Sequence, residues 1–370
     1  MAKKRAEGGG APKKKRSAKR TPPREEGKAS RARVARAAEF VPDDHEVEEL
    51  RRIAQSSAST KKRNRKKVRR LLWNVFHRDA KGDPANRDKY FALSMAIPKV
   101  FAETMKVYYP DLAKVLDFDR GRLAPTTRNR MFDRKIADFA VIVPVFDPNL
   151  GEFEIMPIVE HKAQSGRNVD RTTLINAAQY AVLSTADRLK ETIEAERDGK
   201  TRICPRSLIV VFFTGADENW TAPSMDECFP VPTGLEKYAF HMDVQSVNIT
   251  KLWKEGALKG SPHLRAIFTA LAAGGSYQIS EFFVEIIGLF NQIENFDDDA
   301  RYSMRSCITY AFQTAGQSGQ RITPEIYAKA RKQLENREMQ EEMEIFRGFA
   351  SEEELDARLK TGIKTGGKGA

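Results

Sequence analysis

Three absences limit what this chain of 370 residues can be. No stretch of 18 or more apolar residues occurs, so the sequence offers no candidate for a membrane-spanning helix and no membrane partner is expected. The basic N-terminus leads into Glu, Gly and Pro instead of an apolar segment of about 7 to 15 residues, which argues against a secretory signal. We find no internal repeat, which argues against a repeat architecture.

Cysteine is also scarce. The three cysteines, Cys204, Cys228 and Cys307, are far apart and odd in number, so they fit a reducing compartment and match no zinc-binding spacing. We interpret them as ordinary packing residues. The hydrophobic content of 41% is, in contrast, sufficient for a sizeable core.

Positive charge is concentrated at the N-terminal end. Residues 1–70 contain 24 Lys/Arg and 9 Asp/Glu, a net charge of +15, whereas residues 71–370 contain 63 − 24 = 39 and 51 − 9 = 42, a net charge of −3. Such basic runs commonly contact polyanions, although a solvated tail that keeps the protein soluble is the alternative. The residues expected to contact DNA phosphates are Lys13, Lys14, Lys15, Arg16, Lys61, Lys62, Arg63, Lys66 and Lys67.

Composition divides the chain into four parts. Residues 1–70 are expected to form a disordered basic tail, 71–275 an α/β domain, 276–349 a helical extension, and 350–370 a helix end with a flexible tail. Within the domain, residues 88–116 predict two or three helices interrupted at Pro98 and Pro110. Residues 169–197 predict one long helix.

The helical extension has a recognisable start. Thr323 is the expected N-cap and Pro324 the first helical residue. An apolar stripe follows, which either packs against the domain or forms a homodimer through the C-terminal helices. Its members are Ile326, Ala330, Leu334, Met339, Met343 and Phe346.

Two adjacent segments predict a β-hairpin. Residues 136–146 and 152–162 flank the turn-forming sequence DPNLG, and pairing Phe146 with Glu152 places opposite each other residues whose numbers sum to 298. Further strands are predicted at 207–214, which is apolar enough to be covered by helices on both faces, and within 238–248.

This register has a chemical consequence. Asp138 is expected to face Glu160, with Lys162 on the same face and His161 on the other. Two close carboxylates repel each other unless a cation lies between them, and a hard divalent ion is the natural one, with Mg²⁺ first and Mn²⁺ or Ca²⁺ as alternatives. Such a site is suited to hydrolysis of a phosphodiester backbone, whereas the alternative is a chance surface ion pair.

The order of these motifs resembles the PD-(D/E)XK nuclease fold, a mixed sheet flanked by helices. More narrowly, the chain resembles the recombination-promoting nuclease family, also called the Rpn or YhgA-like transposase family. The stretches that carry the resemblance are DKYFALSMAIPKVFAETM, DRKIADFAVIVPV, IVEHKAQSGRNVDRTTLINAAQY and PRSLIVVFFTGADENWTAPSMDECF, within about residues 86 to 275.

The resemblance implies a metal-dependent DNA endonuclease. Asp138, Glu160 and the backbone carbonyl of His161 would be metal ligands, and Lys162 the third catalytic group. The family usually has Gln where this chain has Lys162, a departure toward the wider superfamily that favours an active site. An early Asp of the family matches Asp88, and relatives are chiefly bacterial, so a cytoplasmic, nucleoid-associated location is expected, or the nucleus in a eukaryote.

Further residues have two interpretations. Gln179 either lies over the metal or packs its helix on the sheet, while Arg167 and Arg171, at the helix start, are candidates for DNA phosphate contacts. His161 is expected to be a packed histidine rather than a general base. Two rival functions stay open: a catalytically silent DNA-binding protein on the same fold, and an interaction protein that acts through its C-terminal helices.

Overall fold

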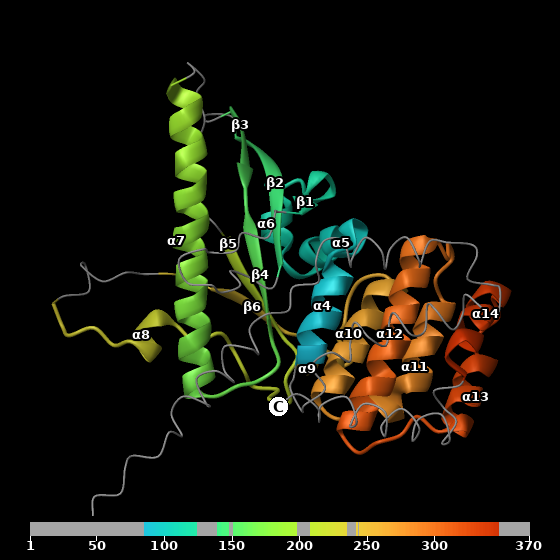
Figure 1. The fold of residues 1–370 in the computed structure, drawn as a ribbon. Helices are drawn as coiled ribbons and strands as arrows, with labels where there is room; N and C mark the ends of the chain where they lie inside the picture. The colour runs from blue at the N-terminus through green and yellow to red at the C-terminus, as the bar shows by residue number, and fades with distance from the viewer. Residues whose placement is uncertain are drawn as a thin grey trace, which may run out of the picture. The chain divides into compact units, whose positions relative to one another are not determined.

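A mixed β-sheet organises the part of the chain that the computed structural model describes, which is residues 85–123, 139–147, 151–197, 208–234, 242 and 244–347 (Figure 1). The strand order is β1-β2-β4-β5-β6, with β3 also paired to β2. Pairing is antiparallel among the first four strands and parallel from β4 to β6. The strands are β1 Arg122–Leu123, β2 Phe139–Asp147, β3 Gly151–Ile155, β4 Pro157–Lys162, β5 Leu208–Phe213 and β6 Gln245–Asn248.

The hairpin has the register that the sequence predicts. Phe146 pairs with Glu152 and Phe139 pairs with Val159, and both pairs of numbers sum to 298. The second predicted strand is nevertheless divided, because β3 ends at Ile155 and β4 begins at Pro157. Proline has no N–H to donate to a ladder, which accounts for the interruption at this point.

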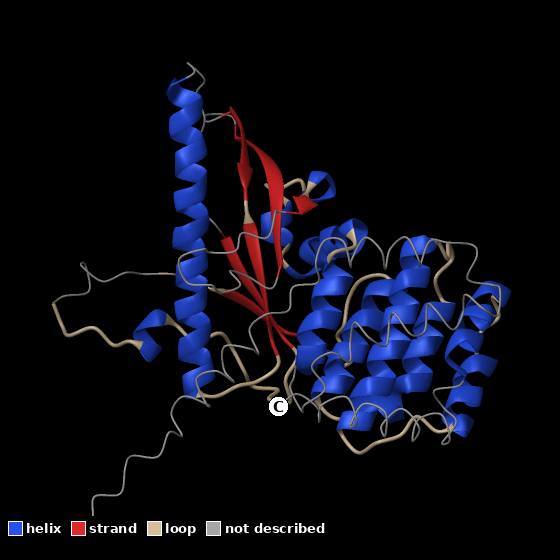
Figure 2. Cartoon of the chain, viewed as in Figure 1, coloured by secondary structure: helices blue, strands red, loops and turns tan. Residues whose placement is uncertain are grey.

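Helices cover both faces of the sheet, as Figure 2 shows. On one face, Val159, Val210 and Phe212 belong to the main hydrophobic core, and on the other Ile158 and Ile209 pack with Ala177 of the long helix α7. Strand β5 is therefore buried on both sides, which confirms the mixed α/β class expected from its apolar sequence. The helix α7 spans Arg167–Arg197.

Prolines set the boundaries of the first helices. Helix α4 spans Ala85–Met95, α5 begins at Pro98 and ends at Tyr108, and α6 spans Pro110–Ala113. The breaks predicted at both prolines are thereby confirmed, since proline is accommodated in the first turn of a helix and not in its interior. Three short helices lie elsewhere in the chain: η2 Phe118–Arg120, α8 Met225–Cys228 after β5, and α9 Ile249–Lys254 after β6.

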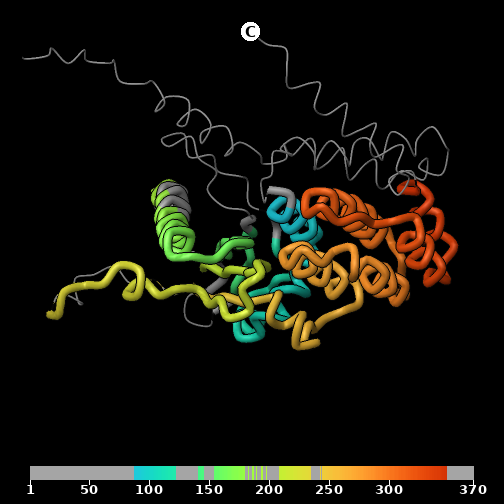
Figure 3. The backbone as a smooth tube through the Cα atoms, turned by 90° about the horizontal axis from the view of Figure 1, so that it is seen from below, coloured from blue at the N-terminus to red at the C-terminus, as the bar shows by residue number. Residues whose placement is uncertain are grey.

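The remaining helices gather on the α4 side of the sheet (Figure 3). They are α10 Pro262–Gly275, α11 Ile279–Asn291, α12 Asp298–Gln317, α13 Pro324–Lys332 and α14 Arg337–Phe346. Thr323 is the N-cap of α13, as predicted. One hydrophobic core contains residues of the predicted α/β domain, such as Phe212, and residues of the predicted helical extension, such as Ile286.

The apolar C-terminal stripe packs inside the chain. Ala330, Leu334, Met339, Met343 and Phe346 are all buried in the core, which is one of the two alternatives that the sequence left open. The stripe is divided between α13 and α14, because Asn336 caps a new helix by accepting hydrogen bonds from the N–H groups of the following turn. A homodimer through these helices would have to use their other faces.

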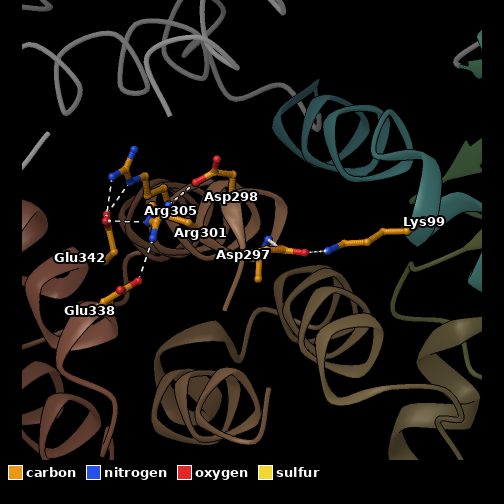
Figure 4. A network of polar contacts seen from close by, with 8 residues as sticks. Lys99, Asp297, Asp298, Arg301, Arg305, Glu338 and Glu342 are labelled. Carbon is orange, nitrogen blue, oxygen red and sulfur yellow. Dashed lines mark hydrogen bonds and ion pairs between the residues drawn. The ribbon is translucent and has the colours of Figure 1, made fainter. Parts of the chain in front are cut away.

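Ion pairs connect helices of this group (Figure 4). The fully buried Arg305 of α12 donates to both carboxylate oxygens of Glu342 in α14, at 2.5 Å from Nε and 2.8 Å from Nη2. At the start of α12, Asp297 accepts from the Ala300 N–H at 2.9 Å and pairs with Lys99 of α5.

None of the helices in the described ranges is long and apolar enough to cross a bilayer.

Candidate active site at the end of β4

Glu160 and Lys162 lie on the face of β4 that α7 covers. They share strand parity with Ile158, which packs against Ala177 of α7, so the predicted common face is confirmed for these two residues. Glu160 is only 3% exposed, and the Lys162 Nζ lies 3.3 Å from its Oε2. The Lys162 side chain is 19% exposed and so retains access to solvent. A carboxylate this deeply buried is expensive unless charges compensate it.

Asp138 lies outside the described residues. It directly precedes Phe139, the first described residue of β2, whose partner across the hairpin is Val159, next to Glu160. Also outside the described residues are the nine basic residues that are expected to contact DNA phosphates, which are Lys13, Lys14, Lys15, Arg16, Lys61, Lys62, Arg63, Lys66 and Lys67.

His161 points to the opposite face, as its strand parity predicts, and is 2% exposed. Its Nδ1 lies 2.5 Å from Oδ1 of Asp88 in α4, and its Nε2 lies 2.7 Å from Oγ1 of Thr214, directly after β5. The imidazole also stacks on Phe91, with ring centroids 4.8 Å apart. His161 is thus a packed residue held at both ring nitrogens, and these bonds fix the backbone between Glu160 and Lys162.

The structure brings Asp88 to His161 and not to the Glu160 face. The sequence resemblance singled out Asp88, but its partner could not be identified because the two residues are 73 positions apart. Thr214 was missed altogether. Its signal was weak, since a threonine after a strand has no distinctive spacing.

Gln179 lies on the outer face of α7. Its side chain is exposed, whereas Ala177, about 200° away around the helix, is fully buried against Ile158. The structure therefore does not bring Gln179 together with Glu160. The neighbouring Tyr180 side chain is not among those described.

The two arginines at the start of α7 differ in their surroundings. Arg167 is exposed to solvent, as a phosphate-binding residue requires. Arg171 is half-buried, because its Nε donates to the Cys228 carbonyl at 3.2 Å and its guanidinium lies 5.9 Å from the centroid of the Phe229 ring. Arg171 thus anchors the segment around α8, and Arg167 is the better placed of the two for an external anion.

An aromatic pair borders the site on the α7 side. Phe213, which pairs with Lys162 in register, stacks on Trp220 with ring centroids 4.4 Å apart. The Trp220 Nε1 donates to Oδ1 of Asp170 in the first turn of α7, at 3.0 Å. Gly215 makes this arrangement possible, since a β-carbon there would overlap the Phe213 ring and the Ala163 carbonyl. Phe213, Gly215 and Trp220, which lie in the last of the four stretches that carry the sequence resemblance, thus connect β5 to α7.

One of the two predicted side-chain metal ligands, Glu160, lies among the described residues. No three of their His, Cys, Asp and Glu side chains lie close enough together to hold an ion. The buried Glu160 carboxylate suits a hard divalent cation.

Comparison of the chain with family models, with curated proteins and with solved structures finds no match. The class that the structure itself defines is a mixed α/β protein with a buried carboxylate and an ammonium group at the end of a central strand.

Proposed function

We propose that this chain is a divalent-metal-dependent DNA endonuclease with a PD-(D/E)XK core, related to the recombination-promoting nucleases. The observation that carries the proposal is the position of Glu160 and Lys162. They lie on one face at the end of β4 with their charged groups 3.3 Å apart, and the sequence predicts that Asp138 faces Glu160. The order β2, β4, α7 and β5 supports it, because the resemblance requires a hairpin, a helix and a parallel strand in this order.

The proposed site uses a small set of groups. Asp138, Glu160 and the backbone carbonyl of His161 would hold the cation. When bound, a divalent cation such as Mg²⁺ supplies Lewis-acid polarisation of a phosphodiester oxygen and lowers the pKa of a coordinated water. The Lys162 ammonium is close enough to Glu160 and sufficiently exposed to neutralise charge that develops on the phosphate or to orient the attacking water.

Other residues would bind or position. The hydrogen bonds of His161 to Asp88 and Thr214 hold the strand end from the opposite face, so that Glu160 and Lys162 keep their places. The exposed Arg167 and the basic tail would bind DNA phosphates without reading sequence. Each neutralised phosphate should contribute about −0.9 to the log–log salt dependence of binding.

Nicking of supercoiled plasmid tests this function. The native chain should nick DNA with Mg²⁺ or Mn²⁺ and not with EDTA, and Glu160→Gln and Lys162→Met should each lose the activity. Glu218 and Lys254 form a matched control, because they are an exposed carboxylate–ammonium pair on other elements. Glu218→Gln and Lys254→Met should nick as the native chain does.

The same assay separates the rival functions. DNA binding measured alongside by fluorescence anisotropy should be retained in the Glu160 and Lys162 variants. Binding without cleavage under any metal would identify a catalytically silent DNA-binding protein and overturn the nuclease proposal. Absence of both binding and cleavage would favour an interaction protein.

A further inference from the structure

The outer face of α7 has an unusual composition for an exposed helix. Ile175, Val182, Leu189 and Ile193 are 44%, 59%, 47% and 42% exposed. Between Thr172 and Ala186, fifteen consecutive residues include no Asp, Glu, Lys or Arg. A helix that stays in water normally carries charge on its outer face, and depletion of charge around apolar residues is typical of the centre of an interface.

The exposed residues follow a coiled-coil spacing. We define the α7 stripe as the positions that alternate by four and three residues along this face. Its members, all exposed, are Ile175, Gln179, Val182, Ala186, Leu189 and Ile193. This is the spacing at which one helix presents a continuous seam to another, and the stripe spans 19 residues, or about 27 Å of helix. The buried residues Thr173, Leu174 and Ala177 belong to the opposite face.

The stripe is complementary to a reversed copy of itself. In an antiparallel pair, residues whose numbers sum to 368 meet, so that Ile175 meets the partner's Ile193 and Val182 meets the partner's Ala186. The centre then combines a large and a small side chain, and the ends combine two large ones. A two-fold axis repeats each contact, as a closed dimer requires.

Charge favours the antiparallel direction. Residues 167–177 carry two Lys/Arg and one Asp/Glu, 2 − 1 = +1, whereas residues 187–197 carry three and four, 3 − 4 = −1. A reversed partner sets each positive end against a negative end, and it also sets the helix macrodipoles in opposite directions. A parallel partner would place like-charged ends together.

We propose that the α7 stripe is the interface of an antiparallel homodimer of this chain. This surface is distinct from the C-terminal helices, whose apolar stripe is already buried within the chain. The seam is just under three heptads long, which is shorter than the roughly three to four heptads by which a coiled coil is identified in a sequence, so the dimer should be weak. Gln179, which meets the partner's Leu189 in this register, should lower the affinity because its amide is buried against an apolar side chain.

Sedimentation of the full chain tests the proposal over concentrations of about 1 to 100 µM, where a weak dimer dissociates. The native chain should shift from monomer to dimer over this range. Val182→Asp should weaken the dimer by more than about tenfold, because it buries a carboxylate beside the two-fold axis. Gln179→Leu should strengthen it several-fold.

Val115→Asp is the matched control, because Val115 is also 59% exposed but lies outside α7. It should dimerise as the native chain does, and circular dichroism should show that all variants are folded. A native chain that is monomeric throughout, or a dimer equally stable in Val182→Asp, would overturn the proposal.

Disulfide cross-linking tests the direction. Chains carrying Val182→Cys should cross-link with chains carrying Ala186→Cys under mild oxidation, well above either preparation alone. The native chain, whose cysteines include the buried Cys228 and Cys307, gives the background. Efficient cross-linking of Val182→Cys with itself would show a parallel pair and contradict the antiparallel arrangement.

Discussion

The imidazole Nδ1 of His161 lies 2.5 Å from the Oδ1 of Asp88, which ties the end of β4 to helix α4. The other ring nitrogen contacts Thr214, so the histidine connects β4, α4 and the segment after β5. The residue between Glu160 and Lys162 is therefore held from the face of the sheet opposite to the proposed site.

Replacing His161 by Phe should destabilise the protein. The His161→Phe variant keeps an aromatic ring on Phe91 but loses both hydrogen bonds, and the Thr214 hydroxyl is fully buried. Leaving a buried polar group without its bond lowers the free energy of unfolding by about 1 to 3 kcal/mol. Urea denaturation should show this loss. Asp88→Asn, which can still accept from the ring, should lose less. Equal stability of His161→Phe and the native chain would contradict this view of the contact.

The buried pair of Arg305 and Glu342 should be sensitive to loss of one partner. Arg305→Met removes both hydrogen bonds to the buried Glu342 carboxylate and leaves it the longer ion pair with Arg301, whose Nε lies 3.3 Å away, which should lower the free energy of unfolding by about 1 to 3 kcal/mol. The double variant Arg305→Met with Glu342→Leu should recover part of this loss, as measured by urea denaturation. Arg337→Met, which removes the exposed pair with Glu341, should change stability by less than about 1 kcal/mol. Similar losses of stability in Arg305→Met and Arg337→Met would contradict the expectation that the buried ion pair matters more than the exposed one.

Gly275 should not tolerate a side chain. A β-carbon there would overlap the backbone carbonyl of Thr214, the residue that also holds His161, so neither backbone can move away without disturbing the strand end. Gly275→Ala should therefore destabilise the protein by about 1 to 3 kcal/mol in thermal or urea unfolding. Gly316→Ala in α12 has open space around its β-carbon and should be neutral or stabilising by up to about 1 kcal/mol. Equal effects at the two glycines would rule out this close approach.

His263 should make stability depend on pH. The pKa of His263 is lowered from 6.5 to about 4, chiefly by burial and in addition by Lys99, while Asp297 acts in the opposite direction. As the pH falls, His263 binds a proton in the unfolded chain before it does so in the folded chain. The stabilisation that comes from the buried, neutral imidazole is therefore fully present above pH 6.5 and is lost as the pH falls toward 4. The free energy of unfolding should decrease by up to about 1.4 kcal/mol per pH unit in this window. Urea denaturation at pH 7 and pH 5 should show a smaller decrease for His263→Phe. If stability decreases as much in His263→Phe as in the native chain, another group causes the pH dependence.

Local signals in the sequence determined much of the fold. The spacing of the apolar residues and the length of the DPNLG turn gave the hairpin register, and Pro98 and Pro110 gave the helix boundaries, because both depend on neighbouring residues alone. The division of the second strand at Met156 was missed, although Pro157 provided a signal for it. The break between α13 and α14 was also missed, because Asn336 was not interpreted as a cap.

The parts that could not be predicted depend on contacts distant in sequence. The shared face of Glu160 and Lys162 follows from strand parity, but the contact of His161 with Asp88 requires knowing how α4 packs against the sheet. Similarly, periodicity predicted a helix around Gln179 without showing which of its faces meets the sheet. The structure shows that Ala177 faces Ile158 and that Gln179 lies in the exposed stripe.

Equilibrium binding of Mn²⁺, followed by electron paramagnetic resonance of the free ion, tests the central claim most directly. The native chain should bind Mn²⁺ at a site that is lost in Glu160→Gln and in Asp138→Asn and retained in Glu218→Gln, and Mg²⁺ should compete for it. Mn²⁺ binding of equal affinity and stoichiometry in the native chain, Glu160→Gln and Asp138→Asn would contradict the claim and leave Glu160 and Lys162 as a structural ion pair.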